Sequence, residues 1–150
     1  MNPNSHAIRL QSVHLRYGDT PVIHDISFEV PPNRLVTLAG PSGSGKSTLL
    51  RTLCRMNDRL SGFALTGKIE VMGQDIHHPS IDLNDLRRRV GLVFQKPCVF
   101  PKSIFHNTIF GLKYHRPKDK GLFSELAKRA LVQAGLWNEV KDRLDDPAAT

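Results

Sequence analysis

Apolar residues near the start of the chain recur at every second position. The alternation is loose in residues 7–18 (AIRLQSVHLRYG) and clear in residues 22–30 (VIHDISFEV). A period of two is typical of a strand that buries one face. We therefore predict two half-buried strands here, and a Pro-Pro-Asn turn follows the second. One face of the second strand carries Ile26, Phe28 and Val30.

Continuous apolar runs appear further along. Residues 34–40 (RLVTLAG) and 90–95 (VGLVFQ) are short runs without alternation, which favours strands buried on both faces. A glycine-punctuated segment, 61–67 (SGFALTG), precedes a third and shorter strand candidate at 68–73 (KIEVMG). The sequence therefore predicts a sheet with both antiparallel-looking and buried strands.

A helical period of apolar residues first appears directly after residue 46. In residues 47–56 it comprises Leu49, Leu50, Leu53 and Met56. Residues 82–90 (DLNDLRRRV) predict a short helix with Asp82 as its N-cap. We expect Arg87 to Arg89 to form a solvated face of that helix, with ion pairing to a partner as a second role.

The last third of the chain is predicted to be helical. Residues 103–112 (SIFHNTIFGL) predict one packed helix, and the polar stretch 115–121 (HRPKDKG) predicts a connection. Residues 122–136 predict an amphipathic helix with two adjacent apolar rows, Leu122, Leu126 and Ala130 beside Phe123, Ala127 and Leu131. The whole pattern predicts a mixed α/β domain with an attached β-rich layer.

Between the first buried strand and the first helix lies a glycine-rich loop. Residues 39–50 read AGPSGSGKSTLL and fit the pattern G-x-x-x-x-G-K-[ST], with Gly40, Gly45, Lys46 and Ser47 at its fixed positions. Glycines let successive backbone N–H groups turn towards one anion, and the following helix adds the positive end of its dipole. Lys46 would reach the β- and γ-phosphates, and the Ser47 hydroxyl would coordinate Mg²⁺. The alternative is a glycine-rich turn with a solvated lysine.

Composition narrows the class of protein. The 150 residues carry a net charge of +7, but aromatic residues do not interleave with the basic ones, so nucleic acid is not an expected partner. Cys54 and Cys98 form no C-x-x-C pair and fit a reducing compartment. His24, His77 and His78 show no convergent ligand set, and we expect them at the surface. Neither an apolar leader nor a run of 18 apolar residues occurs, so we expect a soluble chain.

Several segments together resemble a known family. Tyr17, the phosphate loop and VGLVFQ ending in Gln95 resemble the nucleotide-binding domain of ABC transporters. The stretches RMND (55–58), FPKSIFHNTIFGL (100–112) and LWNEVKDRL (136–144) are similar to the ATP-binding subunit of bacterial phosphate importers. The resemblance implies a P-loop NTPase core with an N-terminal antiparallel β layer in residues 1–97, and the start of a helical subdomain in residues 98–150.

The resemblance also implies a site. Tyr17 would stack on adenine, Gln95 would reach Mg²⁺ and the attacking water, and Ser47 would be the other magnesium ligand. The expected ATP-binding residues are Tyr17, Gly40, Pro41, Ser42, Gly43, Ser44, Gly45, Lys46, Ser47, Thr48 and Gln95. Residues 96–107 would meet the permease, although Cys98 and Val99 stand where the family usually has Asn-Pro.

By resemblance the chain belongs to a transport ATPase on the cytoplasmic face of the cell membrane. Its partners would be a second ATP-binding subunit, head-to-tail, two permease subunits and, indirectly, a phosphate-binding protein. Three alternatives stay open: an importer ATPase for another solute such as polar amino acids, a non-catalytic nucleotide-binding fragment, and a small P-loop kinase. Transfer of phosphate to a nucleoside acceptor would identify the kinase.

Hydrolysis in this family needs an LSGGQ-type signature, an Asp-Glu pair after an apolar run and a later histidine. The sequence contains none of them and ends near where the signature would begin, so we expect a truncated domain without a catalytic base. The Asp-Glu strand would pair beside residues 34–40. Without it, we expect that run to leave an apolar edge exposed and the chain to be poorly stable alone.

Overall fold

A computed structural model describes residues 6–96, 98–115 and 117–149, with backbone alone at 117–119. The chain divides into two compact units, Met1–Val93 and Phe94–Thr150.

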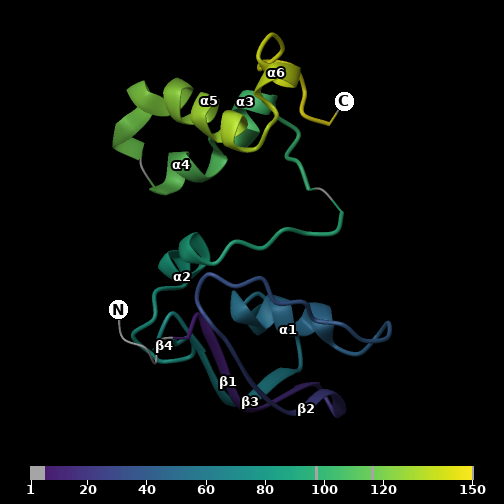
Figure 1. Cartoon of the computed structure of the whole chain (residues 1–150). Helices are drawn as coiled ribbons and strands as arrows, with labels where there is room; N and C mark the ends of the chain where they lie inside the picture. Colours follow the sequence, from purple (N-terminus) through teal and green to yellow (C-terminus); the bar gives the residue numbers. More distant parts are fainter. Residues whose placement is uncertain (1–5, 97, 116, 150) are drawn as a thin grey trace. The chain divides into compact units, whose positions relative to one another are not determined.

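The first unit is built on a four-stranded antiparallel sheet (Figure 1). Its strands run in the order β2-β1-β3-β4, with bounds Ile8–Tyr17 for β1, Thr20–Val30 for β2, Phe63–Val71 for β3 and Gln74–Asp75 for β4. The two predicted half-buried strands are confirmed as β1 and β2. The predicted strand at 68–73 forms the second half of β3, which begins earlier, inside the glycine-punctuated segment.

Strand β1 is bulged in its middle. Its register shifts against β2 between Leu10 and Val13, and against β3 between Gln11 and His14. Ser12, in the bulge, has a positive φ of 45°. The extra residue changes which side chains face the core, so Leu10, Val13 and Leu15 are all buried although their spacing is not a strict period of two.

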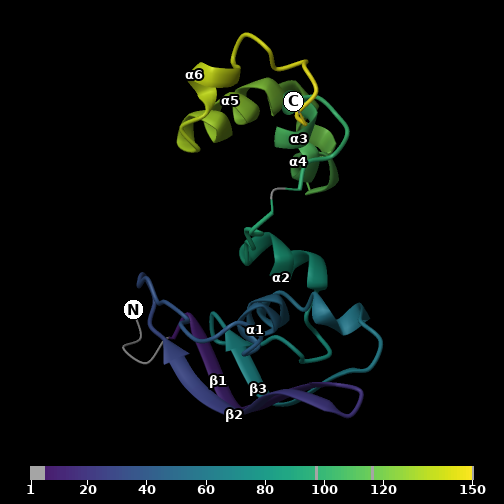
Figure 2. The ribbon, with the colours of Figure 1, turned by 90° about the vertical axis from the view of Figure 1, so that its right-hand side faces the viewer.

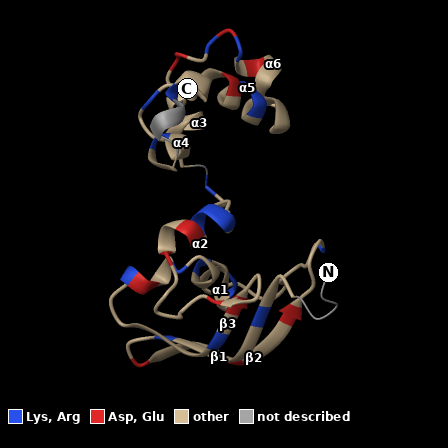
Figure 3. Cartoon of the chain, turned by 90° about the vertical axis from the view of Figure 1, so that its left-hand side faces the viewer, with Lys and Arg blue, Asp and Glu red and all other residues tan. Residues whose placement is uncertain are grey.

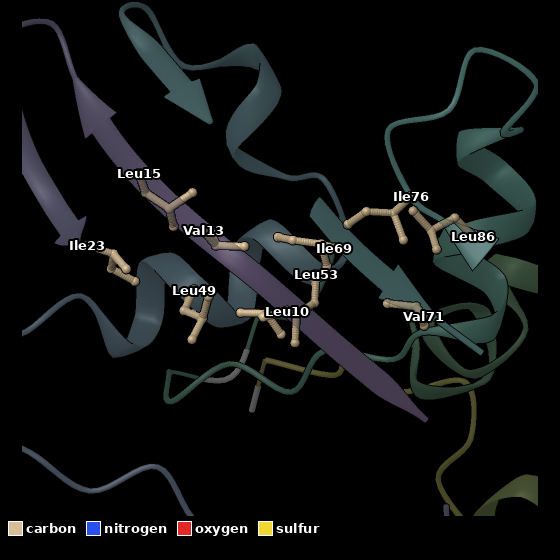
Figure 4. Close-up of a cluster of buried hydrophobic side chains, with 10 residues drawn as sticks. All are labelled: Leu10, Val13, Leu15, Ile23, Leu49, Leu53, Ile69, Val71, Ile76 and Leu86. Atoms are coloured by element: carbon tan, nitrogen blue, oxygen red, sulfur yellow. The ribbon is translucent and has the colours of Figure 1, made fainter. Parts of the chain in front are cut away.

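Helix α1 (Lys46–Leu53) covers one face of this sheet (Figure 2). Leu49 and Leu53 of the helix pack against side chains from the strands, as Figure 4 shows. Of the four apolar residues at helical spacing, Leu49 and Leu53 are buried, whereas Leu50 is 42% exposed and Met56, beyond the end of the helix at Leu53, is 40% exposed. The buried cluster comprises Leu10, Val13, Leu15, Ile23, Leu49, Leu53, Ile69, Val71, Ile76 and Leu86.

After α1, a short 3₁₀ turn, η1 (Asn57–Arg59), leads into β3, and helix α2 (Leu83–Arg89) follows β4. The predicted N-cap of α2 is confirmed, since the Asp82 carboxylate accepts a hydrogen bond of 2.7 Å from the Asn84 backbone N–H. Leu86 anchors α2 in the core cluster.

The strands predicted at 34–40 and 90–95 are absent from the described residues. Both stretches are irregular, and Leu35 and Val93 are 98% and 97% exposed. A strand exists only where a neighbour accepts and donates its backbone hydrogen bonds, and no described segment pairs with either stretch. The apolar composition is therefore correct for strands, but the pairing that defines a strand is missing.

The second unit is helical. It contains α3 (Ile104–Thr108), α4 (Phe110–His115), the 3₁₀ turn η2 (Pro117–Leu122), α5 (Phe123–Gln133) and α6 (Trp137–Val140). The single helix predicted at 103–112 is therefore interrupted at Ile109. The Thr108 hydroxyl donates to the Ile104 carbonyl at 2.9 Å, a back-bond that bends helices. In the predicted connection 115–121, Arg116 lies outside the described residues.

The predicted helix at 122–136 is confirmed as α5, with one of its two apolar rows inside. Phe123, Ala127 and Leu131 are buried, whereas Leu122 is 50% exposed. Phe123 and Ala127 form a second buried cluster with Ile109. The start of α3 is joined to the last part of this unit: the backbone N–H groups of Ile104 and Phe105 donate hydrogen bonds to the carbonyls of Asp146 and Leu144.

Candidate nucleotide-binding site

The glycine-rich loop ends at the start of α1. Gly45 is the N-cap, in the left-handed region at φ 85°, and makes no side-chain cap. The first intrahelical bond is donated by Leu49 to the Gly45 carbonyl, at 2.8 Å. The N–H groups of Lys46, Ser47 and Thr48 therefore lie outside the bonding of the helix itself, and uncapped N–H groups of this kind bind anions.

Packing explains why position 45 is a glycine. A Cβ there would meet Ile23 Cγ1 at 2.9 Å and the Val22 carbonyl oxygen at 3.1 Å. Strand β2 thus contacts the loop at Gly45, the residue where the chain turns into the helix with a positive φ. The close approach of β2 and the turn both require glycine, and together they fix where α1 begins.

Lys46 supplies the positive charge of the loop. Its Nζ donates to the Gly40 carbonyl at 2.8 Å, the Pro41 carbonyl at 2.6 Å and Ser44 Oγ at 3.2 Å. The ammonium is therefore held inside the curve of the loop. The first turn of α1 holds no acidic residue, so nothing in that turn neutralises the positive helix end.

A pocket of about 400 Å³ opens beside the loop. Loop residues Gly40, Pro41, Ser44 and Lys46 line one side, and residues 22–26 of β2 line the other, with Asp25 and His24 among them. Uncapped N–H groups, a central ammonium and an exposed serine hydroxyl at position 47 are the donor set that a nucleotide triphosphate with Mg²⁺ needs. The residues present fit the predicted ligand.

Tyr17 closes the hairpin between β1 and β2. It pairs with Thr20, and its half-buried ring lies 5.4 Å from the ring of Phe63. It does not line the pocket beside the loop, but Val22, two residues beyond Thr20, does. Stacking of Tyr17 on adenine stays a prediction.

The remaining predicted site residues are divided between the units. Pro41, Ser42, Gly43 and Ser44 are exposed in the loop, and Thr48 is half-buried in α1. Gln95 is exposed and belongs to the second unit, so its predicted contact with Mg²⁺ stays a prediction. Within the described residues, no three His, Cys, Asp or Glu side chains converge in a way that could hold a metal ion.

Two sequence-based interpretations need correction near the far end of α1. Arg87 is half-buried, and its guanidinium binds the carbonyls of Cys54 and Arg55, so it is not part of a solvated face. His77 is half-buried too, and burial lowers the pKa of its imidazole. Runs such as RMND and RRR carry no local period that would reveal these contacts, because the partners lie 32 and 33 residues apart in sequence.

None of the helices in the described ranges is both long enough and apolar enough to cross a membrane.

Comparison with known proteins identifies the family of the chain. The family described as ABC transporter matches residues 23–150. Among curated proteins, the phosphate import ATP-binding protein PstB 1 of Vibrio parahaemolyticus is 46% identical over 142 residues, 95% of this chain and 52% of that protein. The PstB protein of Idiomarina loihiensis is 44% identical over the same shares. The predicted resemblance is thus confirmed, and the chain spans about half the length of the curated relatives it matches.

A solved structure is similar as well. The structure of a bacterial Atm1-family ABC exporter with ATP bound matches with a TM-score of 0.61 and 33% identity, over 74% of this chain and 18% of that one. The predicted fold class is therefore confirmed: an antiparallel sheet, a phosphate-loop helix and further helices are those of an ABC ATPase domain. The chain belongs to the ABC transporter family.

Proposed function

We propose that this chain is part of an ATP-binding subunit that couples ATP binding and hydrolysis to the import of inorganic phosphate. The observation that carries the proposal is the 44–47% identity, over 95% of the chain, to proteins named for phosphate import. The geometry of the loop supports it, because an uncapped helix start and a central lysine suit a triphosphate.

Most of the predicted site residues then have a role. The N–H groups of residues 43–48 and the Lys46 ammonium hold the phosphates, Tyr17 supports the adenine, and Ser47 and Gln95 hold Mg²⁺. Mg²⁺ held by these residues would supply positive charge that offsets the negative charge of the phosphates. The chain's own contribution is to position the nucleotide, since it offers no residue that we assign as catalytic base.

The two units correspond in this proposal to different parts of the ATPase domain. Residues 1–97 form the nucleotide-binding core with its β layer, and residues 98–150 begin the helical subdomain. The partners are a second ATP-binding subunit arranged head-to-tail, two membrane-spanning permease subunits and, indirectly, a phosphate-binding protein. The chain would lie on the cytoplasmic face of the membrane.

Residues 96–107 are the proposed contact with the permease. Pro97 lies outside the described residues, and Cys98 and Val99 are exposed. The Asn107 side chain accepts a hydrogen bond from Phe100 N at 2.8 Å and donates to the carbonyls of Lys102 and Ser103 at 3.1 and 3.0 Å. This clamp supports the proposal, because it ties the surface residues 100–103, which precede α3, to that helix.

A nucleotide titration tests the first half of the proposal. The chain is titrated with a fluorescent ATP analogue and Mg²⁺, and Lys46→Ala is compared with Lys113→Ala as the matched control. Loss of a charge-assisted contact should weaken binding by about 1.5–3 kcal/mol, roughly 10- to 150-fold. Equal affinity of parent and Lys46→Ala would mean that the loop is not the nucleotide site.

Transport tests the second half. The gene for this chain is deleted in its host, and uptake of radiolabelled phosphate and of a labelled polar amino acid is measured at low solute concentration. The expected result is loss of phosphate uptake with unchanged amino-acid uptake, restored by the intact gene. Loss of amino-acid uptake instead would assign the chain to a different importer, and unchanged uptake of both would argue against a role in either.

A further inference from the structure

At the end of α1 remote from the phosphate loop, the backbone carbonyls accept hydrogen bonds from groups outside the helix. The helix ends at Leu53, and Arg55 then turns the chain with a positive φ of 54°. Asn57, which follows, is completely buried although it is polar. The last carbonyls of a helix need partners from outside it, so the groups that satisfy them determine where this end of α1 is held.

Arg87 of α2 satisfies one of these carbonyls, that of the C-cap Cys54, and also the carbonyl of Arg55, which follows it. Its Nε donates to the Cys54 carbonyl at 3.1 Å and its Nη2 donates to the Arg55 carbonyl at 2.8 Å. The guanidinium thus joins α2 to α1 through a planar fork, a geometry that a lysine cannot reproduce. A cation at this end also complements the negative end of the α1 dipole.

The arginines beside Arg87 make no such connection. Arg88 pairs with Asp85 of its own helix at 2.6 Å, and Arg89 donates to the Gln74 side chain at 3.1 Å. Figure 3 shows these basic residues together at the end of α2. Position 87 alone among the three reaches the phosphate-loop helix, and its neighbours therefore serve as controls.

Hydrogen bonds continue from this junction back to the first turn of α1. Asn57 Nδ2 donates to Thr52 Oγ1 at 2.8 Å and to the Thr48 carbonyl at 2.9 Å. The Arg55 side chain binds Asp58 at 2.7 Å and the Ile76 carbonyl at 3.1 Å. Thr48 lies next to the loop, so both ends of α1 belong to one bonded network that includes α2.

From this geometry we infer that Arg87 is a positioning residue, which transmits a displacement of the phosphate-loop helix to α2 and to residues 90–93 that follow it in the same unit. The inference rests on the proposed function, because the displacement originates in nucleotide binding at the loop. α2 ends at Arg89, and Gln95 is six residues further along the chain. The Arg87 fork therefore connects the phosphate-loop helix by hydrogen bonds to the helix that precedes Gln95 in sequence.

Hydrogen–deuterium exchange of the whole chain, with and without Mg-ATP, tests this route. Peptides covering residues 40–53 report nucleotide binding, and peptides covering 83–93 report the response of α2 and the segment after it, without Gln95, which would contact Mg²⁺ directly. In the parent we expect ATP to slow exchange in both regions, by roughly three- to tenfold. In Arg87→Met the slowing should persist in residues 40–53 and disappear in residues 83–93.

Two further variants distinguish a role of Arg87 in transmitting the ATP response from a role in stabilising α2 alone. Arg88→Met removes a neighbouring guanidinium with no bond to α1 and should behave like the parent. Arg87→Lys keeps the charge without the fork and should restore only part of the response. A variant that merely loosens α2 would speed exchange equally with and without ATP, so the ATP-dependent difference is the deciding quantity.

The outcomes are distinct. Retained ATP protection of residues 83–93 in Arg87→Met would overturn the inference, as would the absence of that protection in the parent. Absence of protection in residues 40–53 of the parent would instead contradict nucleotide binding, and with it the proposed function.

Discussion

Gly67 of β3 lies directly against the bulge of β1: a Cβ atom at position 67 would fall well inside van der Waals distance of the Ser12 carbonyl oxygen and 2.6 Å from that of Gln11. Gly67 also has a φ of 88°. The bulge and the glycine are therefore one feature, since neither strand could keep this register with a side chain at position 67.

Replacement of Gly67 should be among the most damaging single changes in the sheet. We expect Gly67→Ala to destabilise the first unit by about 2–4 kcal/mol, from the positive φ together with the clash with backbone atoms that cannot turn aside. Urea unfolding followed by circular dichroism measures the loss. Gly73→Ala is the matched control, because Gly73 has a φ of 75° with nothing within 4 Å of its Cβ position. The control should lose only about 1 kcal/mol, and equal losses would refute the role of the close approach.

Tyr17 offers a test of the base-binding end of the site. If its ring stacks on adenine, Tyr17→Ala should weaken ATP binding by about 1–3 kcal/mol, and GTP binding equally, because stacking tolerates either base. Tyr17→Phe should keep most of the affinity. Competition titrations against a fluorescent nucleotide provide the comparison, with Tyr114→Ala in the second unit as the control, since Tyr114 is 71% exposed. Selective loss of one nucleotide would indicate hydrogen bonding to the base.

The stability of the first unit should depend on pH through His77. Burial lowers the pKa of this imidazole and nearby Arg55 lowers it further, against the opposing effects of Asp58 and Asp75. Its Nδ1 is buried and has no hydrogen-bond partner among the described residues. Below the ordinary histidine pKa near 6.5, the unfolded chain binds a proton that the folded chain resists, so stability should fall as the pH drops through this range.

The measurement is the urea midpoint at pH 7.5 and at about pH 5.5. His77→Gln, which stays neutral, should lose part of the difference between the two conditions. His24→Gln alters an exposed histidine of the same unit and should leave the difference unchanged. A pH response that is identical in parent and His77→Gln would assign it to other groups.

Patterns within short segments were sufficient to predict β1, β2, α1, α2 and α5. Each of these elements carries its own signal, such as the Asp82 cap of α2 or the apolar row Phe123, Ala127 and Leu131 of α5. The phosphate loop was predictable for the same reason, because the glycines and Lys46 that form it lie within seven residues, 40–46. Local signals fail where a structure depends on a distant partner.

Residues 34–40 illustrate that failure. Their composition suits a buried strand, but the hydrogen bonds of a strand come from a neighbour, and none is present among the described residues. The prediction for Arg87 is wrong for a related reason. An arginine near a helix end usually faces water, and only the folded arrangement brings its Nε to 3.1 Å from the Cys54 carbonyl oxygen. Sequence therefore predicted the ligand-binding loop better than the network behind it.

The apolar stretches 34–40 and 90–95, which pair with no described segment, predict that the chain associates with itself. Leu35 and Val93 expose nearly all of their side chains, and exposed apolar segments with free backbone groups template pairing between chains. We expect the chain to self-associate as its concentration rises, and Leu35→Lys to reduce this. Thr37→Lys adds the same charge to an exposed position of the same stretch without removing apolar surface, so it should help less. Sedimentation velocity over a tenfold concentration range would resolve the three proteins, and a parent that stays monomeric throughout and unfolds cooperatively would show that this stretch is not a liability.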